Sequence, residues 1–157
     1  MLFRSANEGI ITLKIGEPQV TDSRLALYRK FHEQRSQSRG WSDRDGDPIA
    51  YHESFVSNPF PTEEWTFWLG DELVGLGLVD ALSVGLSAIY FVHDPEHSRR
   101  GLGVWNVLTL IEETRKRGLP YLYLGYWVRD CLSLAYKSGF RPNQILDDQG
   151  RWIDQPE

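Results

Sequence analysis

Two short stretches contain the residues whose types and spacing could do chemistry. The first reads Asp-Pro-Glu-His-Ser-Arg-Arg-Gly-Leu-Gly from Asp94 to Gly103, between an apolar segment and an expected helix. Its glycines would let a ligand approach the backbone closely, and a helix N-terminus beside arginines favours an anion. The residues predicted to bind phosphate here are Arg99, Arg100, Gly101 and Gly103. An ordinary capped turn is the alternative for this spacing.

The second stretch runs from Leu122 to Pro142 and combines an aromatic-rich strand, a glycine and a short helix. The helix contains the single cysteine, Cys131, and a Tyr136-Lys137 pair. Corners between a strand and a helix often direct side chains into a cleft, so we expect chemistry here as well as packing. The predicted lining of this cleft is Tyr123, Tyr126, Trp127 and Cys131, with core packing as the alternative for at least one aromatic ring.

Neither cysteine nor metal chemistry is expected. Cys131 has no histidine near it in the sequence, and a half-buried helical cysteine is usually inert. His93 and His97 are separated by Pro95, which disfavours the helix that would direct both imidazoles to one metal ion. A single cysteine also excludes an internal disulfide.

The elements that must position these stretches form a mixed α/β (α+β) arrangement, a mostly antiparallel sheet flanked by helices. Strands are expected at residues 10–15, 65–69, 73–82, 86–93 and 121–126, with one more short strand near 144–152. Helices are expected at about 22–37, 49–56, 101–117 and 131–138. The continuously apolar segment 88–92 predicts a central strand that is buried on both faces.

Composition limits the class of protein. The chain has 157 residues, 41% hydrophobic and 25% charged, which is typical of one globular domain over residues 1–157. No leader and no long apolar run is recognisable, so a cytoplasmic protein without a membrane partner is expected. The net charge of −5 argues against neutralisation of long duplexes. The basic residues are nevertheless grouped, which permits a local anionic ligand.

Several ordered motifs carry a resemblance to a known family. The Arg-Gly-x-Gly loop and the later segment AYKSGF at 135–140 resemble the GNAT acyltransferase superfamily. A closer resemblance, over about residues 20–152, is to the C-terminal domain of the arginyl/leucyl-tRNA–protein transferases. It rests on YFVHDPEH at 90–97, RGLG at 100–103, GLPYLYLGYW at 118–127, Cys131, Tyr136-Lys137 and FRP at 140–142. A GNAT-like fold is what both resemblances imply.

The closer resemblance implies acyl transfer from an ester that is already activated. Such an enzyme mainly orients an α-amine against the ester carbonyl and stabilises the oxyanion. By this resemblance, Tyr136 donates a proton to the departing ribose oxygen or positions it, and Asp94 orients the attacking ammonium or accepts its proton. Capping of the turn beside Pro95 is the alternative role of Asp94.

The resemblance also assigns roles in substrate binding. Cations are expected to hold tRNA phosphate or an acceptor carboxylate, with solvated surface charge as the alternative. Those cations are Arg99, Arg100, Lys137 and Arg141. Aromatic rings could stack on the terminal adenine of a tRNA. Those rings are Tyr123, Tyr126 and Trp127.

The implied function is transfer of leucine or arginine from aminoacyl-tRNA to the N-terminal α-amine of a protein or peptide, without a cofactor. One alternative is an N-acetyltransferase of the GNAT superfamily that uses acetyl-CoA. Another is a non-catalytic binding module that keeps the fold. The expected partners are the acceptor end of aminoacyl-tRNA and protein N-termini. Bacterial members of the family begin with a region bearing paired cysteines, so a separate chain that supplies this region is a further expected partner.

Overall fold

The computed structural model describes residues 7–40, 46–128 and 130–155. The chain divides into two compact units, Met1–Tyr123 and Leu124–Glu157. The expectation of a single domain over residues 1–157 therefore stays a prediction.

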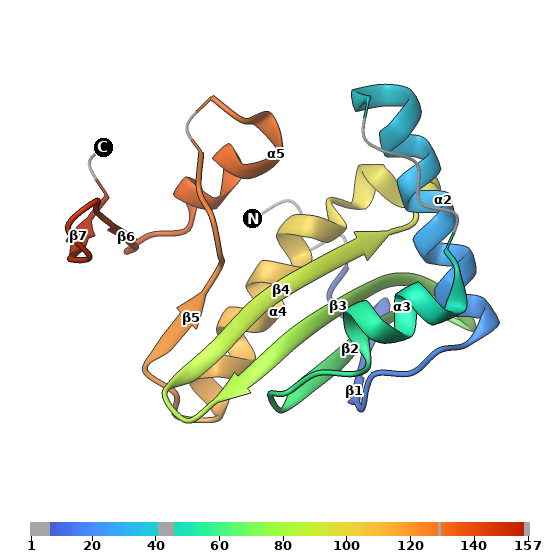
Figure 1. Ribbon diagram of the computed structural model, residues 1–157, viewed down its shortest axis with the longest axis horizontal. Coiled ribbons are helices and arrows are strands. Elements are labelled where there is room, and N and C mark those ends of the chain that lie inside the picture. The colour runs from blue at the N-terminus through green and yellow to red at the C-terminus, as the bar shows by residue number, and fades with distance from the viewer. Residues whose placement is uncertain (1–6, 41–45, 129, 156–157) are drawn as a thin grey trace. The chain divides into compact units, whose positions relative to one another are not determined.

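The first unit is built on a five-stranded sheet whose strands follow one another in chain order (Figure 1). The strands are β1 (Ile11–Gly16), β2 (Thr62–Leu69), β3 (Glu72–Leu82), β4 (Gly85–His93) and β5 (Tyr121–Tyr123). Neighbours from β1 to β4 are antiparallel, and β5 runs parallel to β4. This confirms the predicted mixed, mostly antiparallel sheet.

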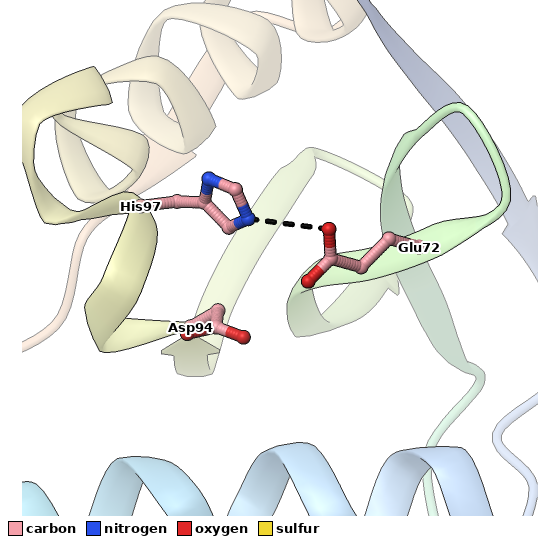
Figure 2. A group of neighbouring side chains, drawn as sticks. All are labelled: Glu72, Asp94 and His97. Atoms are coloured by element: carbon pink, nitrogen blue, oxygen red, sulfur yellow. Dashed lines mark hydrogen bonds and ion pairs between the residues drawn. The ribbon is translucent and has the colours of Figure 1, made fainter.

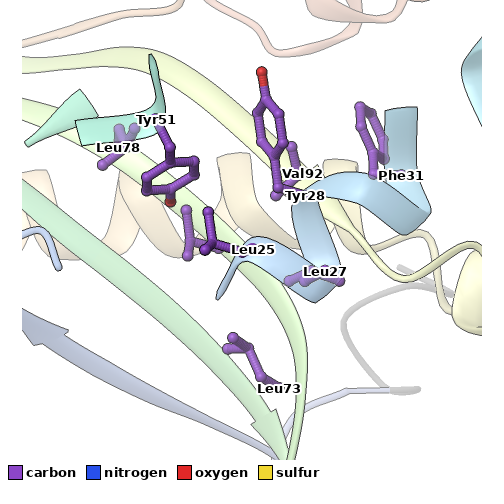
Figure 3. Close-up of a cluster of buried hydrophobic side chains, with 9 residues drawn as sticks. Leu25, Leu27, Tyr28, Phe31, Tyr51, Leu73, Leu78 and Val92 are labelled. Carbon is purple, nitrogen blue, oxygen red and sulfur yellow. The ribbon is translucent and has the colours of Figure 1, made fainter. Parts of the chain in front are cut away.

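Helices cover both faces of this sheet. The helices are α2 (Asp22–Arg39), α3 (Pro48–Phe55) and α4 (Leu102–Lys116), with the 3-10 helix η1 (Pro95–Arg100) before α4. Figure 1 shows α2 and α3 on one side of the sheet and α4 on the other. Leu25, Tyr28 and Phe31 of α2 belong to one buried cluster with Leu78 and Val92 of the sheet (Figure 3). A second cluster joins Leu102 and Leu110 of α4 to Trp65, Phe67 and Val74.

The helix ends follow from local sequence. Asp47 caps α3, since its carboxylate accepts hydrogen bonds from the backbone N–H groups of Ile49 and Ala50, at 3.3 and 3.2 Å. Gly40 ends α2 in the left-handed conformation, with φ of 66°. Thr21, the N-cap residue of α2, makes no side-chain capping bond. Its hydroxyl accepts a hydrogen bond from Arg24 instead.

Strand β4 departs from the sequence prediction in a way that matters for the site. The pairing with β3 shifts register between Leu78 and Val79, which leaves Ile89 of β4 without a partner in the register. Ile89 is 51% exposed, so the prediction that 88–92 is buried on both faces is wrong. The parallel pairing with β5 covers only Gly85–Ser87 of β4. Within the described ranges, no strand pairs with the outer edge of β4 from Ala88 to His93.

The second unit is smaller and less regular than predicted. It contains α5 (Leu132–Ala135), the 3-10 helix η2 (Tyr136–Gly139) and an antiparallel pair, β6 (Gln144–Leu146) and β7 (Trp152–Asp154). The predicted helix 131–138 is thus a single α turn followed by a 3-10 turn, and the single last strand is a two-stranded hairpin. Strand β5 ends at Tyr123 rather than at 126, because Gly125 has φ of 71°.

None of the described helices combines the length and the apolar character that crossing a bilayer requires.

Candidate functional site

The loop between β4 and α4 is held in shape by its own side chains and by a residue far away in the sequence. The carboxylate of Asp94 accepts a hydrogen bond from the backbone N–H of Glu96 at 2.8 Å and so caps η1. The capping role that the sequence offered for Asp94 is therefore confirmed. At the other end of η1, the side-chain amide of Asn7 donates to the carbonyl of Arg100 at 2.9 Å. The loop is fixed at both ends.

Two glycines at the start of α4 differ in what they allow. Gly101 is the N-cap residue of α4 with φ of 61°, a conformation that other residues adopt only under strain. At Gly103 a Cβ atom would meet nothing within 4 Å, so the first turn of α4 is open on that side. Leu102 between them is 1% exposed and anchors the turn in the core. Gly101 is therefore required by the backbone conformation, whereas Gly103 leaves space beside the helix.

This helix terminus has the features of an anion site. The first N–H groups of an α-helix have no acceptor within the helix and carry a partial positive charge. Arg99 is exposed and Arg100 half-buried, both in the last turn of η1 immediately before α4. The arrangement can bind a phosphate or a carboxylate. Phosphate binding by Arg99, Arg100, Gly101 and Gly103 remains a prediction on this geometry.

Asp94 is held by a cation that the sequence analysis did not single out. The ammonium of Lys30 on α2 lies 2.7 Å from Oδ2 of Asp94 and 3.2 Å from the carboxylate of Glu96. Burial raises the pKa of Asp94, but the bonds from Lys30 and the Glu96 N–H outweigh it and the net pKa lies below the ordinary value. The carboxylate is therefore ionised at neutral pH and is a poor proton acceptor.

Glu72 and His97 lie beside Asp94 (Figure 2). Nε2 of His97 is 3.3 Å from a carboxylate oxygen of Glu72, and one ligand atom from each of Glu72, Asp94 and His97 lies within 4.8 Å of the others. This spacing alone would suit a cation. Because the Asp94 carboxylate is already bonded to Lys30, we interpret the group as a network of hydrogen bonds and ion pairs that fixes η1 against β3 and α2.

The carboxyl end of β4 carries a histidine that packs against α2. The His93 ring contacts the Phe31 ring edge to face at 5.3 Å, and the guanidinium of Arg35 lies 5.0 Å from the centre of the same Phe31 ring. Burial lowers the pKa of His93, and the nearby charge of Arg35 lowers it further against the opposing effects of Asp94. His93 is therefore neutral at pH 7.

A second imidazole lies deeper under α2. The hydroxyl of Tyr90 on β4 is 2.7 Å from Nε2 of His32, which is 2% exposed. The two rings are stacked at 6.1 Å. The sequence analysis did not identify this pair. The burial of His32 and its contact with Tyr90 depend on how α2 packs on the sheet, which only the tertiary structure shows.

The remaining predicted site residues divide between the two units. Tyr123 ends β5 and contacts Tyr121 ring to ring at 6.1 Å. In the second unit Tyr126 is 87% exposed, Trp127 and Cys131 are half-buried, and Cys131 precedes α5 as its N-cap residue. The prediction that the stretches 94–103 and 122–142 line one cleft stays a prediction.

Tyr136 and Lys137 have distinct surroundings. Tyr136 is 40% exposed and contacts Phe140 edge to face at 6.2 Å. Burial raises its pKa, so the phenol is protonated at neutral pH. The ammonium of Lys137 donates to the carbonyls of Leu124 and Tyr126 at 2.6 and 2.9 Å. These carbonyls belong to the segment where the predicted strand ends.

Arg141 is also occupied within the second unit. Its guanidinium donates to the carbonyl of Gln155 at 2.5 Å, which ties the exit of η2 to the residue that follows β7. Phosphate binding by Lys137 and Arg141 remains a prediction, and both side chains have a structural task as well.

Comparison with known proteins shows the family of this chain. The family model described as arginine-tRNA-protein transferase, C terminus, matches residues 23–147. An aspartate/glutamate leucyltransferase from Chromobacterium violaceum is 46% identical over 132 residues, covering 84% of this chain and 53% of the relative. The chain spans 53 to 61% of the length of this and two further relatives of the same name.

Two solved structures show the fold. The ribosomal-protein-S18-alanine N-acetyltransferase from Escherichia coli has a TM-score of 0.57 and 18% identity, covering 90% of this chain and 88% of its own. An acetyltransferase of the GNAT family from Staphylococcus aureus has a TM-score of 0.55 and 14% identity, covering 85 and 86%. The predicted GNAT-like fold is confirmed.

Proposed function

This chain belongs to the arginine-tRNA-protein transferase C-terminus family, and we propose that it transfers leucine from Leu-tRNA to the α-amine of proteins that begin with Asp or Glu. The choice of donor and acceptor follows the name of the 46% identical relative, an aspartate/glutamate leucyltransferase. Arginine from Arg-tRNA is the alternative donor, after the description of the family. Aminoacyl-tRNA is a co-substrate, and the reaction needs no further cofactor.

The observation that carries the proposal within the structure is the loop at the N-terminus of α4. It combines Gly101, the open turn at Gly103 and two arginines directly after the carboxyl end of β4. A phosphate of the tRNA acceptor end would bind at this terminus, because the exposed N–H groups and the guanidinium groups both favour an anion. The aminoacyl ester would then lie along the unpaired edge of β4.

The chemistry requires little from the protein beyond placement. The ester is already activated, so the site has to orient an amine against its carbonyl and protonate the leaving ribose oxygen. Tyr136 is our proposed proton donor, and its raised pKa keeps the phenol protonated. Tyr123, Tyr126 and Trp127 are proposed to stack on the terminal adenine. Asp94 is proposed to orient the acceptor ammonium.

We also propose a partner and a location. A separate chain bearing the paired cysteines of the family's bacterial N-terminal region would increase the activity when added in trans. The reaction would take place in the cytoplasm, where aminoacyl-tRNA is abundant. Addition of that region from a bacterial relative to the assay tests the partner directly.

The deciding experiment offers labelled Leu-tRNA, Arg-tRNA and acetyl-CoA to this chain with peptides beginning with Asp, Glu, Lys or Arg. We expect transfer of leucine to the Asp and Glu peptides. Transfer of acetyl groups instead would favour an N-acetyltransferase. Stabilisation by Leu-tRNA without any transfer would favour a binding module.

A variant pair tests the anion loop in the same assay. Replacement of Arg99 and Arg100 by Gln should weaken binding of Leu-tRNA and reduce the salt dependence of log K by about one per lost phosphate contact. Arg115→Gln is the matched control, because Arg115 is exposed at the opposite end of α4. Equal effects of both changes would contradict a phosphate site at the loop.

A further inference from the structure

The reaction proposed above needs a group that accepts a proton from the acceptor amine. The nitrogen that attacks the ester must lose a proton to become an amide. The sequence offered Asp94 for this task. Its carboxylate is bonded to Lys30 at 2.7 Å and to the N–H of Glu96 at 2.8 Å, and it is 4% exposed. A carboxylate held in this way accepts a proton poorly.

We infer that His93 is the catalytic base of the acyl transfer, accepting the amine proton at Nε2. This inference rests on the proposed function. His93 is the last residue of β4 and lies opposite Gly75 of β3 in the register. It therefore stands at the carboxyl end of the edge that β5 leaves unpaired, one residue before the loop that leads to the proposed phosphate site.

The hydrogen bonds of His93 fix which nitrogen is available. Nδ1 lies 3.3 Å from the backbone carbonyl of Asp94, and a carbonyl can only accept, so we assign the proton to Nδ1. The lone pair of the neutral ring is then on Nε2. Among the residues that the structure describes, Nε2 of His93 has no hydrogen-bond partner. This nitrogen is thus able to take a proton.

The surroundings of His93 keep the ring neutral and oriented. Phe31 from α2 contacts the ring at 5.3 Å and Phe91 from β4 at 6.1 Å. The charged groups that face it are Arg35 from α2 and Asp94 from its own strand end, and Lys30 neutralises Asp94. Gly75 of β3 contributes no charge. Burial and Arg35 lower the pKa of His93 below the ordinary value of 6.5.

The step balances as follows. The neutral α-amine attacks the ester carbonyl carbon, and a C–N bond forms as the C–O bond to the ribose breaks. The proton that the nitrogen loses goes to Nε2 of His93. The ribose oxygen takes a proton from the general acid, for which Tyr136 is proposed above. Proton exchange with water then restores the neutral imidazole and the phenol, and the products are an amide and tRNA with a free hydroxyl.

The test uses the 157-residue chain with Leu-tRNA and a peptide that begins with Asp. His93→Gln should reduce kcat by about 10²- to 10⁴-fold, the range for loss of a positioned base. In the wild type, log kcat/KM should rise with a slope of two at the lowest pH, because both His93 and the amine must be deprotonated. In His93→Gln the slope should be one. Imidazole added to His93→Ala should restore part of the rate.

His52→Gln is the matched control, since His52 is exposed on α3 and should leave rate and slope unchanged. A rate of His93→Gln within threefold of wild type, with a slope of two, would overturn the inference. So would a loss that imidazole does not restore and that parallels a lower Tm. The titration of His93, followed by NMR without substrates, separates the two proposals. A ring that stays protonated across the whole pH range in which leucine is transferred would overturn the role of His93, whereas absence of transfer by the wild type removes both.

Discussion

The ammonium of Lys30 lies 2.7 Å from Oδ2 of Asp94, which joins the middle of α2 to the start of the loop that precedes α4. The two residues are 64 positions apart in the chain. Lys30 also reaches Glu96, so a single side chain from α2 holds both acidic residues of this loop. The loop that we propose for phosphate binding leads into α4 on one face of the sheet, and it is positioned by α2, which lies on the other face.

Replacement of Lys30 by Met should lower the free energy of unfolding by about 1–3 kcal/mol, because it leaves the buried Asp94 carboxylate without its charged partner. Chemical denaturation at pH 7 measures this. Lys116→Met is the control, since Lys116 is 72% exposed and its pair with Glu113 should contribute less than about 1 kcal/mol. Equal losses in both variants would contradict the importance of the Lys30–Asp94 bond.

The same pair predicts a pH dependence. The folded-state pKa of Asp94 is lowered from its ordinary value of 3.8, so its contribution to stability is fully present above that value and is lost as the pH falls through the folded pKa. The difference in stability between wild type and Lys30→Met should therefore shrink below pH 3.8. Denaturation curves between pH 2 and 7 test this, and a constant difference would contradict it.

The two glycines of the loop should respond differently to alanine. Gly101→Ala should destabilise the protein by about 1–2 kcal/mol, because φ of 61° strains any residue with a Cβ. Gly103→Ala should be neutral or stabilising by up to about 1 kcal/mol, because alanine loses less conformational entropy in a helix than glycine and its Cβ would meet no atom within 4 Å. Gly103→Leu should keep the fold and weaken Leu-tRNA binding. Unchanged binding would show that no ligand approaches this turn.

Tyr136→Phe should reduce the rate of leucine transfer by about 10²-fold or more, since it removes the proposed proton donor and, within the described part of the chain, no hydrogen bond of the phenol. Single-turnover transfer to an Asp peptide is the measurement. Tyr121→Phe serves as the control, because Tyr121 is 55% exposed and has no proposed role in proton transfer. Transfer at the wild-type rate by Tyr136→Phe would remove the assignment.

Lys137→Met should loosen the segment around Gly125 by about 1–3 kcal/mol, because two backbone carbonyls lose a charged donor. Amide hydrogen exchange of residues 124–127 reports this opening. Lys137→Arg keeps donors at the same place and should restore part of the protection. If Lys137→Met weakens Leu-tRNA binding but leaves exchange unchanged, Lys137 binds phosphate instead.

Local patterns were enough to predict most elements of the first unit. The strands β1 to β4 and the helices α2, α3 and α4 all occur within a few residues of their expected ranges, since apolar periodicity and capping residues are local signals. The second unit was predicted less well. Lys137 bonds to the carbonyls of Leu124 and Tyr126, and no periodicity reveals that a side chain replaces a strand partner there.

The sequence by itself determined the family and the GNAT-like fold, and it predicted that the segment from Asp94 to Gly103 is a loop that leads into a helix. Only the tertiary structure decided what Asp94 does, because its partner Lys30 lies on another element and the balance of burial against that ion pair sets its pKa. The same holds for His93. Its neutral state depends on burial against Phe31 and on the nearby charge of Arg35. Both residues lie on α2, so their proximity to His93 cannot be predicted from the spacing of residues along the chain.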